Sequence, residues 1–359
     1  MTTMFIVSLV IAGVFFASPF RRLKILTISD LLKNAYGSHF ERIATLFMIP
    51  FYIGTLASQM VAMGYVFQIC LDNVQDHAAL FSAFSNEFLT LLPDHQSGSD
   101  WLSYGGRILM AGLGAIMGQD LIQRSLSSRS TSVACYSAIA GGVLYLILWL
   151  IPLFIGLAGR IIFPSLEHPE QLIPMLAHKF LSPLAFILFA CGLFSAIMST
   201  ADSYLFAGTS LVTNNIILRI RKTNSEKEKI SWLRGTNIAI ALFAFGLALS
   251  GQKIFDMMVH SGAILFVAIF VPASAAIFWK GAHRVAAWGS LIGGVAFWAG
   301  YLVYNYSTLS SETYEDVLFS AATFGALCSL TAYAVISAVR VLPISFVQPK
   351  PEMIEDIAA

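Results

Sequence analysis

Long apolar segments separated by short polar ones constrain this chain more than any other feature of its sequence. Most of these segments reach the roughly 20 residues that a helix needs to cross a bilayer, and only 11% of all residues are charged. The pattern predicts an all-α, polytopic helical membrane protein with about nine transmembrane segments, at 3–20, 43–70, 105–118, 133–157, 183–218, 234–250, 254–278, 286–305 and 317–339.

These segments predict a single transmembrane domain over residues 1–341 and a short cytoplasmic tail over residues 342–359. Segment 105–118 is shorter than the others. It indicates either a broken helix or a helix that its polar flanks complete.

The basic residues orient the spans. No positive charge precedes the first apolar segment, whereas Arg21 and Arg22 follow it, which is the reverse of the polarity of a cleaved signal peptide. With the N-terminus outside and the C-terminus in the cytoplasm, the positive-inside rule is satisfied, because only four of the 21 Lys and Arg residues fall outside, namely Arg107, Arg160, Lys179 and Lys253. We expect an integral protein of the plasma (inner) membrane, and the net charge of +1 indicates no nucleic-acid partner.

The stretch "SAIMSTADS" at 195–203 places polar side chains inside an apolar span, where such groups are costly unless they face a cavity, a partner or an ion. Ala196, Ser199 and Thr200 stand at i, i+3 and i+4, so one carbonyl and two hydroxyl oxygens share a side of a helix. Sodium, a hard cation, favours such oxygens. The alternative is that the hydroxyls only bond back to the carbonyl four residues earlier.

Asp202 lies on the same helical face as Ser195 and Ser199. Its carboxylate is a candidate cation ligand, proton carrier or support for the ligands. The hydroxyls of Ser195 and Ser203 are candidates for two of these roles, cation ligand and support for the ligands. A structural hydrogen bond to a neighbouring helix is an equally open interpretation of Asp202.

Two further segments carry candidate functional residues. In "AGLGAIMGQDLIQR" at 111–124, three glycines and Gln119 indicate a helix that loosens in the membrane, although glycine serves tight helix packing equally well. In the span at 43–70, Tyr52, Thr55 and Gln59 recur at helical spacing. Together with Gln119 they are candidates for lining a solute path, and the alternative is that they join helices.

No motif typical of an enzyme is found. There is no phosphate-binding Gly-Lys loop, no nucleophile elbow and no His/Cys grouping with metal-ligand spacing. The four cysteines show no paired spacing and are expected to be buried hydrophobic residues. A transporter or channel is therefore favoured over a membrane enzyme, without any cofactor and with sodium as the only expected metal ion.

The segments "GQDLIQR" and "LFSAIMSTADSYLFAGTSLVTNNI" resemble the sodium:solute symporter family. The resemblance implies the five-plus-five inverted-repeat fold of the leucine transporter, with sodium bound by the Ala196 carbonyl and the hydroxyls of Ser199 and Thr200. It also implies that the first seven predicted spans correspond to core helices two, three, six, seven, eight, nine and ten. No counterpart is found for core helices one, four and five, so an incomplete inverted-repeat transporter bundle is expected.

The resemblance leads to three functional hypotheses. The first is sodium-coupled symport of a small organic solute, in which sodium binding favours the outward-open state. The second is a truncated remnant, or one piece of a split symporter whose partner chain supplies the missing helices. The third, a membrane sensor on a transporter scaffold, ranks last because no signalling module follows the final span.

Overall fold

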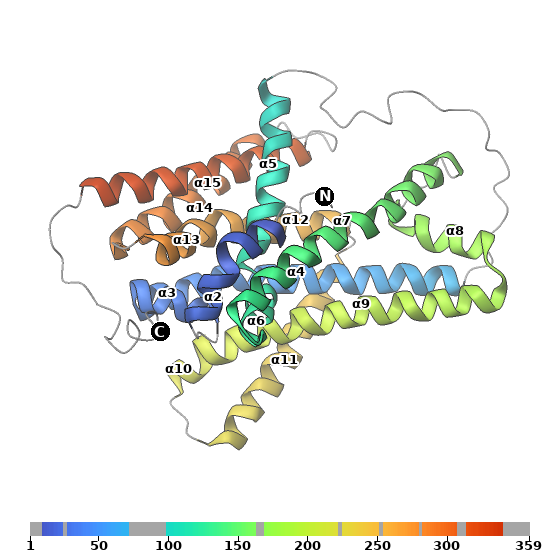
Figure 1. Ribbon diagram of the computed structural model, residues 1–359, viewed down its shortest axis with the longest axis horizontal. Helices are drawn as coiled ribbons and strands as arrows, with labels where there is room; N and C mark the ends of the chain where they lie inside the picture. Colours follow the sequence, from blue (N-terminus) through green and yellow to red (C-terminus); the bar gives the residue numbers. More distant parts are fainter. Residues whose placement is uncertain are drawn as a thin grey trace.

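The computed structural model describes residues 9–23, 27–71, 98–162, 169–221, 225–250, 254–279, 282–306 and 314–339, and every regular element in these ranges is helical. The predicted tail lies outside them. Figure 1 shows the arrangement of the elements, which are η1 (Ala12–Phe16), α2 (Ala17–Leu23), α3 (Ile28–Tyr36), α4 (Ser38–Leu71), α5 (Gly98–Gly114), η3 (Ala115–Met117), α6 (Gln119–Ser127), α7 (Thr131–Ile162), η4 (Pro169–Gln171), α8 (Leu172–Phe180), α9 (Pro183–Val212), η5 (Thr213–Ile217), α10 (Leu218–Ile220), α11 (Glu226–Ala248), α12 (Ile254–Ile264), η6 (Leu265–Phe270), α13 (Val271–Phe278), α14 (Arg284–Tyr306) and α15 (Tyr314–Val339).

Seven helices in the described part of the chain are long and apolar enough to cross a membrane. They coincide with seven of the predicted spans, namely 43–70, 133–157, 183–218, 234–250, 254–278, 286–305 and 317–339. The first predicted span is described only from residue 9 onward. The all-helical membrane fold is thus confirmed, whereas the number of nine spans stays a prediction.

Segment 105–118 is both a broken helix and a helix that its polar flank extends, the two alternatives that its short length indicated. Helix α5 begins at Gly98 in the polar flank, passes into the 3-10 turn η3, and is interrupted at Gly118. Gly118 is extended, with φ −65° and ψ 132°, and α6 starts directly after it. The glycine-rich segment therefore contains a break, which is one of the two interpretations that its composition left open.

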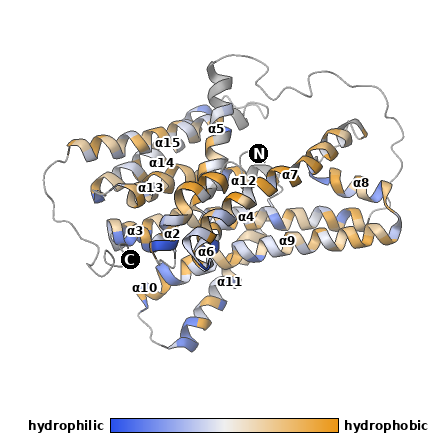
Figure 2. Ribbon diagram, in the orientation of Figure 1, coloured by the Kyte–Doolittle hydropathy of each residue, from blue (hydrophilic) through white to orange (hydrophobic). Residues whose placement is uncertain are grey.

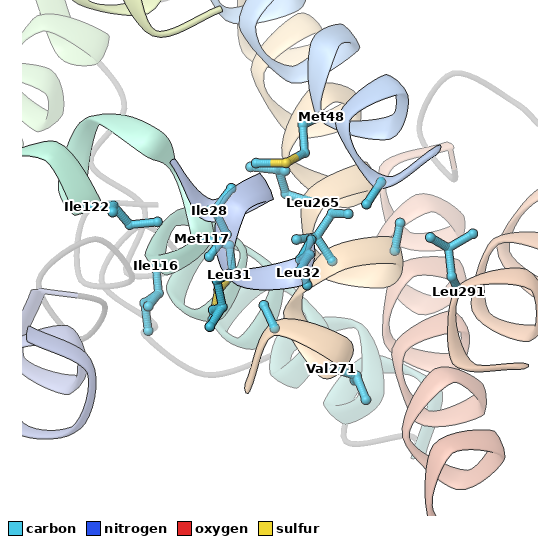
Figure 3. Packing of buried hydrophobic residues seen from close by; sticks show 14 of the residues in the cluster. Ile28, Leu31, Leu32, Met48, Ile116, Met117, Ile122, Leu265, Val271 and Leu291 are labelled. Carbon is cyan, nitrogen blue, oxygen red and sulfur yellow. The ribbon is translucent and has the colours of Figure 1, made fainter. Parts of the chain in front are cut away.

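The main hydrophobic core lies where α3, the N-terminal half of α4, the η3–α6 segment and the α12–α14 region meet (Figure 3). Its large buried side chains come from positions far apart in the sequence, including Ile28, Leu32, Met48, Ile116, Met117, Ile122 and Leu265. The apolar stretch of α12–α13 is 61% buried, whereas those of α7 and α9–α10 are each only 6% buried. The core therefore holds one side of the molecule together and leaves α7 and much of α9 exposed.

Helix α3 was not predicted from the sequence. Thr27 and Asp30 form a capping box at its start, and Leu31 and Leu32 bury its apolar face. At its end, the Tyr36 hydroxyl donates to the Pro272 carbonyl at 2.8 Å. Burial, reinforced by the neighbouring Tyr333, raises the pKa of the Tyr36 phenol above its usual range, so the hydroxyl keeps the proton that it donates.

Helices α4 and α9 run side by side (Figure 1) and pack closely near Gly208. The Tyr204 ring lies 5.9 Å from that of Phe51 and 6.3 Å from that of Tyr52, measured between centroids. A Cβ atom added to Gly208 would lie 2.9 Å from the Cβ of Tyr52. Because that atom is attached to the α4 backbone, a side chain at position 208 would force the two helices apart.

We expect Gly208→Ala to destabilise the protein by about 1–3 kcal/mol, the usual cost of overpacking, despite the better helix propensity of alanine. Gly235→Ala on α11 is the matched control, because no atom lies within 4 Å of its added Cβ. Unfolding of the purified variants in detergent measures the difference. Equal stability of the two variants would contradict the close α4–α9 contact.

Candidate functional site

Helix α9 carries the polar residues that the sequence indicated, which are called the polar stripe here: Ser195, Ser199, Thr200, Asp202 and Ser203. The helix begins at Pro183, a first-turn position that proline tolerates, and continues without interruption to Val212. An open hollow of about 720 Å³ lies along one side of it, lined by Cys191, Phe194, Ser195, Met198, Ser199, Asp202 and Ser203. All seven residues belong to α9 at spacings of three and four, so they form one face of the helix.

The three predicted sodium ligands are exposed on α9. Thr200 Oγ1 donates to the Ala196 carbonyl at 3.0 Å, which is the back-bonded geometry considered as the alternative. This bond uses the hydroxyl proton but leaves lone pairs on the Thr200 oxygen. Ser199 also lines the hollow, whereas Ala196 and Thr200 lie beside it. The three oxygens are of the type that sodium prefers, yet one helix supplies only part of a coordination shell.

The other candidates on the stripe differ in their contacts. Ser203 Oγ donates to the Ser199 carbonyl at 2.9 Å, so this hydroxyl is back-bonded as well. Asp202 is exposed and lines the hollow with Ser195. Among the residues that the structure describes, no hydrogen bond or ion pair involves the Asp202 carboxylate. The proposed structural bond from Asp202 to a neighbouring helix is therefore not found within these ranges.

Tyr52 and Gln119, predicted for a solute path, lie together in the core. Both are fully buried, and the Gln119 backbone N–H donates to the Tyr52 hydroxyl at 2.7 Å. The Gln119 side-chain oxygen accepts a bond from the Ile28 backbone N–H at 3.0 Å. This bonding fits the alternative role of joining helices, since it ties the first residue after the break at Gly118 to both α4 and α3.

Thr55 and Gln59 lie farther along α4. Thr55 is buried and its hydroxyl donates to the Phe51 carbonyl at 2.8 Å, while Gln59 is half-buried. No residue of α4 lines the hollow on α9. A solute path through these two positions stays a prediction.

Sequence reasoning missed Glu41 and Asn215, which meet in the interior of the protein. Both are fully buried, and Asn215 Nδ2 donates to Glu41 Oε1 at 2.9 Å. A signal was present for each residue. Asn215 interrupts the apolar run of segment 183–218, and Glu41 stands next to the start of segment 43–70, where an ionisable group needs a partner.

Comparison with known proteins gives one family. The model of the "Sodium:solute symporter family" matches residues 103–296. The matched region runs from within α5 into α14, so it includes both the break at Gly118 and the polar stripe on α9.

The curated relatives are transporters. The high affinity choline transporter 1 of Homo sapiens is 23% identical over 353 residues, which cover 80% of this chain and 60% of that protein. The choline transporter of Drosophila melanogaster is 24% identical over 409 residues, covering 92% and 64% respectively. The sodium/pantothenate symporter of Haemophilus influenzae is 29% identical over 143 residues, covering 39% and 30%. This chain thus spans about 60% of the length of the choline transporters that it matches.

Among solved structures, the substrate-bound outward-open state of a Na⁺-coupled sialic acid symporter is similar to this chain. The TM-score is 0.67 at 15% sequence identity, and the match covers 96% of this chain and 85% of the other. At this identity the likeness concerns the fold alone. It is the fold of a symporter, as the resemblance of the two motif segments implied.

Proposed function

The chain belongs to the sodium:solute symporter family, and from this premise we propose that it takes part in sodium-coupled symport of a small organic solute across a membrane. Its homologues are transporters and not enzymes. The family implies sodium as the coupling ion. The observation that carries the proposal is the polar stripe on α9, which lies inside the region that the family model matches.

Sodium binds, in this proposal, against the Ala196 carbonyl and the hydroxyl oxygens of Ser199 and Thr200. Asp202 lies within a turn of these oxygens, and its carboxylate adds negative charge next to the cation. Ser195 and Ser203 provide further oxygens along the same stripe. Because bound sodium would favour one conformation of the transporter over the other, the sodium gradient can drive solute uptake.

In this proposal the remaining ligands come from helices other than α9, which the family resemblance assigns to counterparts of core helices one, four and five. Three observations support this part of the proposal. The hollow has a wall on α9 alone. The apolar stretches of α7 and α9–α10 are only 6% buried. The region aligned with the Drosophila melanogaster protein extends over 409 residues, more than the 359 residues of this chain. The alternative is a truncated chain, or one piece of a split symporter completed by a partner chain.

Solute uptake into proteoliposomes tests the proposed function. An inward sodium gradient is compared with an equal potassium gradient, and choline, pantothenate and sialic acid serve as probe solutes because the relatives' names indicate these classes. We expect sodium to increase the uptake of at least one probe when helices equivalent to core helices one, four and five are supplied. Equal uptake in both salts for every probe would contradict sodium coupling.

The N-terminus lies outside and the C-terminus lies in the cytoplasm of a plasma (inner) membrane in this proposal. Segments assigned to the cytoplasm from their basic residues lie near one another in the fold. Arg21 donates to the Ser128 carbonyl at 2.9 Å, and Arg219 pairs with Asp30 at 3.1 Å. Figure 2 shows hydrophilic residues at α2, α6 and the free end of α11. This clustering supports a common side for the basic segments.

Thiol labelling of intact cells tests the orientation. With the native cysteines replaced by alanine, we expect an impermeant reagent to label Ser182→Cys but not Ser225→Cys, because these exposed residues precede α9 and α11 on opposite sides of the membrane. Permeabilised cells control for expression and reactivity. Labelling of Ser225→Cys in intact cells would reverse the proposed orientation.

A further inference from the structure

A polar cluster joins the end of α9 to the beginning of α4, away from the stripe that holds the proposed sodium site. Arg219, on the short helix α10, places its Nε 3.4 Å from Glu41 Oε1. The same oxygen accepts the bond from Asn215. Glu41 Oε2 is buried without a hydrogen-bond partner in the part of the chain that the structure describes. One oxygen of a fully buried carboxylate thus carries both contacts while the other has none.

The cluster also includes α3. Arg219 Nη2 lies 3.1 Å from Asp30 Oδ1, so one guanidinium bridges a carboxylate on α3 and another on α4. Thr27, at the cap of α3, donates through its hydroxyl to Asn215 Oδ1 at 3.1 Å. The two residues from the α9 end therefore contact both α3 and α4.

The backbone at the end of α9 is irregular at these residues. Asn215 lies within the π-helical turn η5, and Arg219 lies in the three-residue helix α10 that follows it. Such π turns are rare and occur frequently at functional sites. Along the chain, η5 and α10 follow the α9–α4 contact around Gly208, so the cluster is a separate contact between the two helices.

Helix α3 connects this cluster with the broken helix. The backbone N–H of Ile28, the residue after Thr27, donates to the side chain of Gln119. Gln119 is the first residue after the extended Gly118. A displacement of α3 would therefore pull on Gln119 and shift the break between η3 and α6. This break lies within the region that the family model matches.

The energetics suit an element that opens and closes. Breaking a buried ion pair is costly because a charge stays buried without its partner. The unpartnered Glu41 Oε2 disfavours the closed form in turn, and the Arg219 side chain is 39% exposed, so water can replace part of its contacts. A permanent brace would gain from pairing both carboxylate oxygens, which is not the arrangement seen.

We propose that Arg219 and Asn215 form a latch with Asp30 and Glu41, which holds the cytoplasmic ends of α3, α4 and α9 together and is released when the cytoplasmic side of the transporter opens. The latch rests on the proposed transport function and on the proposed orientation for its place in the cycle. Its local opening, however, can be measured without any transport.

The test uses two buried serines as reporters in the full chain with the native cysteines replaced by alanine. Ser29→Cys lies one residue before Asp30, where the Ser29 hydroxyl is 2.8 Å from that of Thr45 on α4. Ser290→Cys is the distant control on α14, where Ser290 bonds Ser329 at 2.6 Å. Both serines are fully buried. The labelling rate with an impermeant thiol reagent is measured in membrane vesicles that expose the cytoplasmic face.

Arg219→Ala is expected to increase the labelling rate of Ser29→Cys by about tenfold, a factor that corresponds to about 1.4 kcal/mol, and to leave Ser290→Cys unchanged. Arg219→Lys should restore part of the protection, because it keeps the charge but not the bridging geometry. Arg221→Ala is the matched control: this neighbouring cation lies over the Trp232 ring at 5.5 Å, and its loss should change neither reporter.

Two outcomes would overturn the latch. Equal labelling of Ser29→Cys in the Arg219→Ala and Arg221→Ala variants would show that the cluster does not restrain α3. Equal acceleration at both reporters would show a general loss of stability. A further arm, run with the polypeptide that supplies core helices one, four and five, separates this proposal from the proposed function. Replacing potassium by sodium should then slow the labelling of Ser29→Cys, because bound sodium favours the outward-open state. Absence of this salt effect, with the Arg219 effect intact, counts against sodium coupling and not against the latch.

Discussion

Addition of helices equivalent to core helices one, four and five, to which the proposal assigns the remaining sodium ligands, is expected to raise sodium-driven uptake at least tenfold above that of the chain alone. In this experiment a second polypeptide carrying core helices one, four and five of the family is reconstituted with the chain. The reason is the exposed stripe on α9, which offers the Ala196 carbonyl and the Ser199 and Thr200 hydroxyls from one helix only. With so few oxygens the dehydration of sodium is not offset. Each lost ligand, at about 1–3 kcal/mol, weakens binding by roughly tenfold to a hundredfold.

The added helices would also cover the polar face that carries Asp202, which is unfavourable if it faces lipid. A scrambled polypeptide of the same composition is the control for nonspecific effects on the vesicles. The measured quantity is the initial rate of uptake of the probe solutes in sodium relative to potassium. Robust sodium-driven uptake by the chain alone would contradict this prediction and show that another segment of the chain completes the site.

Replacing Thr200 or Ser199 by alanine is expected to increase the half-saturating sodium concentration by about tenfold to a hundredfold, since removal of one hydroxyl ligand from a dry site costs on the order of 1–3 kcal/mol. Thr200→Ser should retain most of the affinity because it keeps the oxygen. The measurement is the sodium dependence of the initial uptake rate in the complemented system.

Thr331→Ala is the matched control for these variants. Thr331 is exposed on the apolar helix α15, and its hydroxyl donates to the Cys328 carbonyl at 3.1 Å, much as Thr200 donates to Ala196. Its removal deletes a similar back-bond without touching the α9 stripe. If Thr200→Ala and Ser199→Ala behave like Thr331→Ala, the two hydroxyls on α9 serve only back-bonding and sodium binds elsewhere.

Seven of the membrane spans, the weakened helix before Gln119 as one of two open interpretations, and the polar face of α9 could be predicted from the sequence, because each depends on residues that are neighbours along the chain. Hydropathy over some 20 residues identifies a span without knowledge of its partners. A helical repeat of 3.6 residues puts Ser195, Ser199 and Asp202 on one face wherever the helix lies. The glycines before Gln119 weaken the helix at their own position. The sodium-ligand role of the stripe, in contrast, remains a proposal drawn from the family.

Only the tertiary structure decided which buried polar groups meet. Tyr52 and Gln119, candidates for a solute path from their spacing, are bonded to each other in the core. Arg219 reaches Asp30 and Glu41 across about half the length of the chain. Such pairs follow from the way α3, α4 and α9 pack, and no local pattern distinguishes a polar residue with a distant partner from one that faces water or an ion. The sequence determined the helices and their faces, whereas packing determined the contacts, because a hydrogen bond between remote residues depends on the position of every helix between them.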